Sequence, residues 1–465
     1  MPRLSSYQEP SDPRLVDKAY GYNPLFDILL ANDVEALEEY LEEYPPSDER
    51  VAGGVGDIFE EAIRFGSVDA YQTLVAYQKA QAAAGSDLLS PPYRPLWHAC
   101  SYRQVDLVRH LLSTLDNAEV GIISHSDPVH SGGYTPLLCA CSCLANLKPD
   151  WLRRNQVTPA TNLGLSEEIV GLLLDRGASV QDRGEGSERY ETVLSLAITN
   201  AGPDLVRRLI DLGAPLQAPL RFPGEENIVG ATLLHIAATY ANARAIEVLL
   251  GMPEGRDMAT MRDGQGRLPI HWAAGCSWHD VFEGPASASA SASASASAYD
   301  DEQTTAASRV AVTLQLLLSH SPSSVNDRDA SGNTPLHYAA HRLPSRLDNT
   351  IRVLLEHGAD PSLANGDGDT PAHWAPRSQT EPSANHWTDI SPEIERAFDL
   401  LEEANSGDAN LRDRPNNAGL TPRGILDEER ASLEKRVTER AERFARGRGG
   451  GRGRGGRGRG RGSGS

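Results

Sequence analysis

The sequence predicts an all-α protein assembled from a repeated pair of helices. A short motif recurs along the chain, as TLLHIAA over Thr232–Ala238 and as TPLHYAA over Thr334–Ala340. Copies begin at residues 232 and 268 and again at 334 and 370, a spacing of 36 residues in both cases. A fixed period of about 20 to 50 residues is typical of repeat architectures, in which each unit stacks on its neighbours.

Each position of the motif suits the start of a helix. Pro at the first helical position presets φ and gives up an amide that would have no partner there. Thr before the Pro is a favourable N-cap residue. The paired small residues, such as Ala339 and Ala340, leave room for a neighbouring helix to approach closely. We therefore expect a short helix at every copy of the motif.

A second, apolar helix follows each motif, for example Ala245–Leu250, Val312–Leu318 and Ile351–Leu355. Some of these helices run into a Gly, as in Leu212–Ala214 and His357–Asp360. A left-handed Gly commonly closes a helix. Weaker copies extend the array over 93–112, 135–178 and 192–214, and degenerate helix pairs precede them over 23–44 and 57–77.

Motif, period and Gly turns together resemble the ankyrin repeat, whose signature is T-P-L-H-x-A at a period near 33 residues. The resemblance implies an ankyrin-repeat solenoid of about nine helix pairs, with short β-turn fingers between them. It also implies that the signature His hydrogen-bonds backbone between turns and is structural. In this sequence that position holds His235, His271, His337 and His373.

The same reasoning divides the chain into segments. We expect a flexible N-terminus over 1–20, the repeats over 21–425, a C-terminal helix over 426–446 and a disordered Arg/Gly-rich tail over 447–465. The clearest repeats are predicted over 190–220, 230–260, 264–320, 329–363 and 365–410. The N-terminus has no apolar core after a basic start, so we expect no signal peptide.

Three insertions interrupt the period. The largest contains a run of Ser-Ala dipeptides over Ala286–Ala298, for which we expect a disordered loop over 284–307 because the run has no apolar face to bury. A tolerated loop expansion explains this run better than a phosphorylated tether. Two other extensions lie over 146–163 and 376–391. Insertions of this kind often lie on the binding face of a repeat protein.

Charge separates the chain into an acidic body and a basic tail. The net charge is −20, but the last 20 residues hold seven Arg and no acid. Residues 1–445 therefore hold 37 of the 44 basic residues and all 64 acidic ones, a balance of −27. The tail is formed by Arg446, Arg448, Arg452, Arg454, Arg457, Arg459 and Arg461.

Nothing in the sequence indicates catalysis, a metal or a cofactor. Cys139, Cys141 and Cys143 form a C-x-C-x-C run, but zinc sites favour wider C-x2-4-C pairs with a second pair elsewhere. Packing in small buried positions explains them better. The signature His residues lie one repeat apart and do not converge. No Gly-rich phosphate loop or nucleophile elbow is present. We expect a protein that is not an enzyme.

The resemblance places partner binding on the finger tips and the inner helix faces. Predicted tip residues are Tyr134, Arg267, Asn333 and Asp369. Predicted residues after the paired small positions are Tyr240, His341, Arg342 and Arg377. Tyr and Arg are enriched among residues that dominate binding energy. The plain alternative for each single residue is a solvated surface position.

The leading interpretation is a non-catalytic adaptor or scaffold that holds a protein partner, one with a basic surface, and is a monomer by itself. The alternative is an RNA- or ribonucleoprotein-associated factor, because Arg offers phosphate contacts and a stacking face. In that case the tail Arg residues would bind RNA or be methylated. A third use of the tail is docking on the acidic body. Five Cys and no long apolar segment favour the cytoplasm or nucleus over a membrane or secreted setting.

Overall fold

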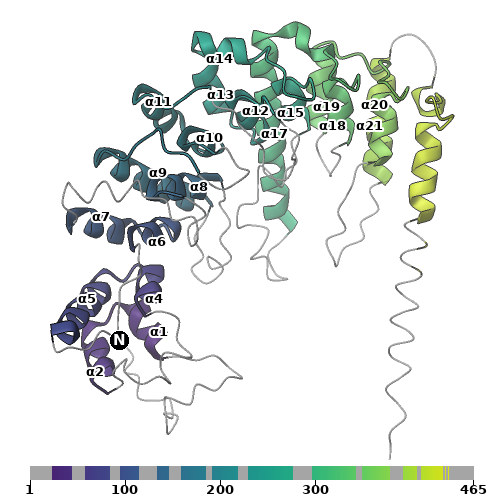
Figure 1. The fold of residues 1–465 in the computed structure, drawn as a ribbon. Coiled ribbons are helices and arrows are strands. Elements are labelled where there is room, and N and C mark those ends of the chain that lie inside the picture. The colour runs from purple at the N-terminus through teal and green to yellow at the C-terminus, as the bar shows by residue number, and fades with distance from the viewer. Residues whose placement is uncertain are drawn as a thin grey trace, which may run out of the picture. The chain divides into compact units, whose positions relative to one another are not determined.

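A computed structural model describes most of the helical part of the chain (Figure 1). It separates into two units: unit 1 is 1–269 with 276–321, and unit 2 is 270–275 with 322–465. The described residues are 24–43, 58–83, 95–114, 134–145, 159–184, 191–217, 229–275, 296–341, 348–377, 391–405, 410–432, 435 and 438.

Unit 1 consists of successive helix pairs. In chain order they are α1 (Pro24–Ala31) and α2 (Val34–Glu43), α4 (Ile58–Phe65) and α5 (Val68–Ala83), α6 (Pro95–Ser101) and α7 (Val105–Thr114), α8 (Pro136–Ala145) and α9 (Pro159–Asp175), α10 (Val193–Ala197) and α11 (Pro203–Asp211), α12 (Leu233–Thr239) and α13 (Ala243–Leu250). A short α14 (Pro253–Met258) and the long α17 (Ala296–His320) complete the unit. The degenerate N-terminal pairs predicted from the sequence are thus confirmed.

Unit 2 repeats the same plan. It contains the body of α15 (Pro269–Ala274), then η4 (Pro322–Asn326), α18 (Pro335–His341), α19 (Asp348–Glu356), α20 (Pro371–Trp374), η5 (Ala375–Arg377), α21 (Ser391–Ala404) and η6 (Leu411–Asp413), followed by a helix over 422–432. An isolated antiparallel bridge joins Arg183 and Thr192. The all-α class is confirmed, with turns rather than strands between the helix pairs.

The first helix of each pair starts as the motif predicts. Pro opens α18 and α20, and both prolines are buried. At α10 the cap is reciprocal, because Thr192 N–H donates to Ser195 Oγ at 2.8 Å and Ser195 N–H donates to Thr192 Oγ1 at 3.0 Å. Such a pair satisfies two helix-end amides that would otherwise lack partners.

Small residues carry the packing between helices. Ala237, Ala238, Ala339 and Ala340 are all at most 2% exposed. Large apolar side chains of the second helices fill the remaining core, as in Leu249 and Leu354, both fully buried. Because Ala adds little width, the backbones of adjacent helices lie near each other and the Leu side chains reach the core from both sides.

We call the turn before a motif helix a finger; fingers lie over 263–267, 329–333, 365–369 and 416–420. A histidine joins each of these fingers, or the residues just before it, to the helix of the preceding repeat. In unit 2, Thr334 N–H donates to His337 Nδ1 at 3.1 Å, and His337 Nε2 lies 3.0 Å from the carbonyl oxygen of Asp369. Since Nδ1 accepts, Nε2 carries the proton and donates to that carbonyl. The structural role implied by the resemblance is therefore confirmed. The other links join His235 to Arg267, His271 to Asp327 and His373 to Leu420.

Ion pairs hold the last elements of unit 2 together. Arg412 on η6 pairs with Glu395 and Glu402 of α21, both at 3.0 Å, and also with Asp399. Its guanidinium lies 5.4 Å from the ring centre of Phe398. Arg430, in the helix over 422–432, also reaches Glu395 at 3.4 Å. These ion pairs tie η6 and the helix over 422–432 to α21.

Three boundaries differ from the sequence-based expectation. Helix α17 begins at Ala296, inside the stretch predicted to be a disordered loop, because Ala is the strongest helix former and extends the apolar helix that follows. Helix α9 begins at Pro159, within the predicted 146–163 insertion. The last helix starts at residue 422 instead of 426. Residues 1–20, 284–295 and 447–465, predicted to be flexible or disordered, lie outside the described residues.

In the described part of the chain no helix combines the length and the apolarity that a bilayer crossing needs.

Replacing His337 by Ala tests the histidine link. The change leaves the Thr334 amide and the Asp369 carbonyl without their buried partner, so we expect the free energy of unfolding to fall by about 2–4 kcal/mol. Urea unfolding followed by circular dichroism measures it. His357→Ala is the matched control, because His357 is exposed and its removal should cost less than about 0.5 kcal/mol. Equal losses in both variants would contradict the link.

The same histidine predicts acid sensitivity. Burial lowers the pKa of His337 to about 4, whereas an unfolded His titrates near 6.5. Between these values the unfolded chain binds the proton and the folded chain does not, so stability is lost as pH falls. From pH 7 to pH 5 the loss from His337 is about 2 kcal/mol. The urea midpoint should therefore change less between pH 7 and pH 5 in His337→Ala than in the parent chain. An equal change in the two proteins would refute the assignment.

Candidate partner-binding surface

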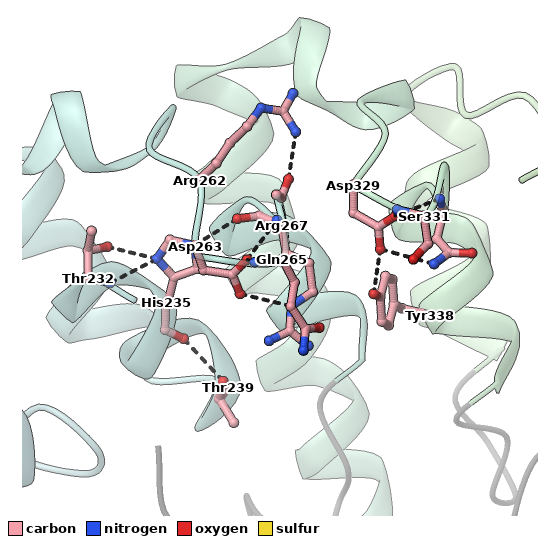
Figure 2. A network of polar contacts seen from close by, with 12 residues as sticks. Thr232, His235, Thr239, Arg262, Asp263, Gln265, Arg267, Asp329, Ser331 and Tyr338 are labelled. Atoms are coloured by element: carbon pink, nitrogen blue, oxygen red, sulfur yellow. Dashed lines mark hydrogen bonds and ion pairs between the residues drawn. The ribbon is translucent and has the colours of Figure 1, made fainter. Parts of the chain in front are cut away.

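Each finger is built by one Asp or Asn that accepts two backbone hydrogen bonds. In unit 1, Asp263 Oδ1 accepts from the amides of Gln265 and Arg267 at 2.9 and 2.8 Å, as Figure 2 shows. In unit 2, Asp329 Oδ1 accepts from the amides of Ser331 and Asn333, both at 2.8 Å. These side chains bend the backbone in the way a turn requires. Asn365 and Asn416 repeat the arrangement.

Fingers of unit 2 are joined to one another by side-chain and backbone hydrogen bonds. Asn365 Nδ2 donates to Asn333 Oδ1 at 2.8 Å, and Asn416 Nδ2 donates to Asp369 Oδ1 at 2.6 Å. The amide of Gly366 donates to the Ser331 carbonyl at 2.9 Å. These contacts fix the spacing of three successive fingers, so that their tips present one rigid edge.

Beside these fingers runs a row of aromatic rings that we call the aromatic strip: Tyr338 and His341 of α18 and Trp374 of α20. The ring centres of Tyr338 and Trp374 are 5.6 Å apart, and those of His341 and Trp374 are 5.4 Å apart, both in edge-to-face geometry. The ring of His271 in α15 also contacts Tyr338, with the ring centres 5.8 Å apart. All three residues of the strip are half-buried, so each ring keeps part of its surface in solvent.

Asp329 connects the strip to the fingers. Its Oδ2 accepts from the Tyr338 hydroxyl at 2.7 Å and from Asn333 Nδ2 at 3.0 Å, and Figure 2 shows Tyr338 below the Asp329–Ser331 turn. Burial opposes its ionisation, but these hydrogen bonds and those from the Asn333 and Ser331 amides outweigh burial and hold its pKa below the ordinary value. Asp329 is therefore a charged carboxylate at neutral pH whose hydrogen-bond donors are neutral groups.

Four of the residues predicted from the sequence lie in this part of unit 2. His341 belongs to the aromatic strip, and Arg377 pairs with Asp369. Asn333 and Asp369 are only 5% and 2% exposed, because both are bonded within the fingers. Their side chains hold the fingers together, while His341 and Arg377 are the members that also face solvent. Partner contact by any of them stays a prediction.

The three predicted residues in unit 1 lie in separate surroundings. The side chain of Arg267 is 12% exposed and its Nε donates to Asp263 Oδ2 at 2.8 Å. Tyr134 packs against Gly184, where an added Cβ would come within 2.9 Å of its ring. Tyr240 ends α12, and its carbonyl accepts from Arg309 at 3.4 Å. Predicted Arg342 and the seven tail Arg residues lie outside the described residues.

The sequence-based prediction missed the position between the signature His and the Ala pair. In unit 2 that position is Trp272, Tyr338 and Trp374, three aromatic residues in successive copies. In unit 1 it holds His98, Cys139, Leu196 and Ile236 instead. The repetition of aromatic residues at one register was visible in the sequence. The hydrogen bond from Tyr338 to Asp329 was not, because it joins a helix residue to a finger residue nine positions earlier.

The cysteines pack in the core of unit 1. Cys100, Cys139, Cys141 and Cys143 are free thiols, each at most 8% exposed. Burial raises the pKa of Cys100 and Cys141, which favours the neutral thiol. Within the described ranges no three His, Cys, Asp or Glu side chains form a group suited to a metal ion.

Comparisons with known proteins support the repeat assignment. Residues 304–384 match the family model for ankyrin repeats in three copies. This range includes α18, α19 and α20, and with them the aromatic strip and the fingers over 329–333 and 365–369. The Thr–His–carbonyl link seen there recurs in unit 1 between His235 and Arg267. The ankyrin repeats predicted from the sequence are thereby confirmed for residues 304–384.

Two individual proteins are similar to this chain. The ankyrin repeat domain-containing protein SAT10 of Stachybotrys chartarum is 27% identical over 227 residues, which are 48% of this chain and 10% of that protein. The chain thus spans about a tenth of that relative's length. The ankyrin repeat domain of Bcl-3, described as a unique member of the IkappaB protein family, aligns with 63% of this chain and 97% of its own, at a TM-score of 0.34 and 20% identity.

A pair of glycine substitutions tests how tightly the fingers pack. Gly368 and Gly358 both have positive φ, at 77° and 85°, so Ala at either costs about 1–2 kcal/mol. At Gly368 the new Cβ would also lie 2.9 Å from the backbone nitrogen of Asn417, whereas nothing lies within 4 Å at Gly358. We expect Gly368→Ala to lower the urea midpoint clearly more than Gly358→Ala; equal midpoints would contradict the finger contact.

Proposed function

We propose that the protein is a non-catalytic adaptor that holds a protein partner against the aromatic strip and adjoining fingers of unit 2. The observation that carries the proposal is the row of Tyr338, His341 and Trp374, whose half-buried rings are fixed by one another and by Asp329. Rings that are already held in place lose little conformational freedom when a partner covers them.

The chemistry of this surface favours a partner with basic and apolar groups. Aromatic faces attract cations as well as apolar side chains. The segment 360–370 around the neighbouring finger contains Asp360, Asp367 and Asp369 and no basic residue; Asp367 is exposed, whereas Asp369 is buried and paired with Arg377. A partner segment that places Arg or Lys beside an apolar side chain would meet both kinds of contact. Ankyrin repeats as a class mediate protein–protein interaction, which agrees with this assignment.

Removal of the strip should abolish partner binding without unfolding the chain. We expect Tyr338→Ala combined with Trp374→Ala to weaken partner capture by at least about 30-fold, since central aromatic residues each contribute on the order of 2 kcal/mol. The measurement is affinity purification of the full chain with quantitative mass spectrometry. Val312→Ala is the matched control, because Val312 is an exposed apolar residue of unit 1.

Two further observations make the result decisive. Tyr338→Phe keeps the ring and removes the hydroxyl, so it should bind more strongly than the double variant. Circular dichroism melting must show that the double variant remains folded. If a folded double variant captures the same partners as the parent chain, the strip is not the binding surface.

A further inference from the structure

In the part of the chain that the structure describes, Asp329 and Asp367 of the unit 2 fingers form no ion pair, whereas Asp369 pairs with Arg377 and the exposed Arg328 adds one positive charge beside Asp329. Among described residues the hydrogen bonds to Asp329 come from Tyr338, Asn333 and the Ser331 amide, all of which are neutral. Neutral hydrogen-bond donors stabilise a carboxylate but do not neutralise its negative charge. Asp367 adds a second, exposed carboxylate on the next finger. A cationic ligand placed against the strip would therefore feel attraction from both.

Unit 2 itself shows how this chain accommodates an arginine. Arg412 lies over the Phe398 ring at 5.4 Å and pairs with Glu395 and Glu402 at 3.0 Å. Arg377, three residues after Trp374, pairs with Asp369. Aromatic stacking combined with carboxylate pairing is a mode that the planar guanidinium performs better than an ammonium group. The aromatic strip offers the same two elements, ring faces and nearby carboxylates.

We propose that the aromatic strip of unit 2 binds the chain's own Arg446–Arg461 segment. This inference rests on the proposed function, because it names a ligand for the same surface, and it makes that ligand a competitor of the partner. The segment carries seven Arg, no acid and no apolar residue, separated by Gly residues that place no bulk between the guanidinium groups. Its charge is opposite to that of the body, whose balance is −27.

Chain length permits the contact. An extended chain covers about 3.3 Å per residue, so the segment from residue 446 to residue 461 reaches roughly 50 Å. Packed helices lie about 8–10 Å apart, and α20 and α18 precede the helix over 422–432 by only a few helix positions within unit 2. An intramolecular ligand on so short a connection acts at an effective concentration in the millimolar range. Weak individual arginine contacts are therefore enough to hold it.

A photo-cross-linking experiment in the full chain tests this placement. p-Benzoylphenylalanine replaces Gly455, in the middle of the Arg run, and irradiation is followed by mass-spectrometric mapping. We expect cross-links to concentrate on residues 329–341 and 367–377. Their yield should fall at least fivefold in Tyr338→Ala/Trp374→Ala and in Asp329→Asn/Asp367→Asn, and should be unchanged in Val312→Ala. Mixing isotopically light and heavy chains shows whether the cross-links form within one molecule.

Each outcome decides the proposal. Intramolecular cross-links confined to those two segments support it. Cross-links spread over other helices, cross-links only between different molecules, or a yield unaffected by the strip variants overturn it. Absence of cross-links to the strip also overturns the proposal. If the tail of that same protein binds single-stranded RNA, the result favours the nucleic-acid role.

The two proposals fail in different ways. If the tail occupies the strip, replacing all seven Arg by Ser should raise partner capture several-fold. If partner capture ignores the strip variants while the cross-links remain, the adaptor surface is wrong and the tail contact stands. If partner capture depends on the strip and the cross-links are absent, the adaptor surface stands and the tail contact is wrong.

Discussion

The hydrogen bond from the signature histidine to the carbonyl of the next finger is the contact on which the structure depends. It joins the start of one short helix to the turn of the following repeat, as from His337 to Asp369 and from His373 to Leu420. The helices that it connects are only a few residues long and would not be stable alone. Burial disfavours the charged ring and lowers the pKa of His337 to about 4, so the histidine remains neutral at pH 7.

Fingers and aromatic strip follow from that link. Once each finger is held at a fixed distance from its helix, an Asp or Asn at its start closes the turn and still has an atom left for a second contact. Asp329 uses that atom to accept the Tyr338 hydroxyl, whereas Asn365 uses it to reach Asn333 in the neighbouring finger. The choice of Asp or Asn therefore decides whether the side chain that closes the turn is itself charged. This choice gives the strip its electrostatic character without loss of the turn.

Unit 1 and unit 2 use the same scaffold for different surfaces. In unit 1 the position after the signature His holds Ile236, which is 7% exposed and serves the core. In unit 2 the equivalent Tyr338 and Trp374 are half-buried and edge-packed. A single register position therefore changes from core packing at Ile236 and Trp272 to partly exposed rings at Tyr338 and Trp374. Fold alone does not set function in such arrays; the side chains placed on it do.

The sequence by itself determined the repeat, its helix starts and its helix ends, since these depend on local chemistry: a Thr cap, a Pro at the first turn, Gly358 with positive φ and the 36-residue spacing. It also identified the structural histidines. Tertiary structure decided which predicted tip residues are buried, because Asn333 and Asp369 pair with Asn365 and Asn416, which are 32 and 47 residues away. It likewise decided that Tyr338 and Trp374 meet. Contacts between repeats depend on how closely neighbouring helices stack, and no local pattern contains that distance.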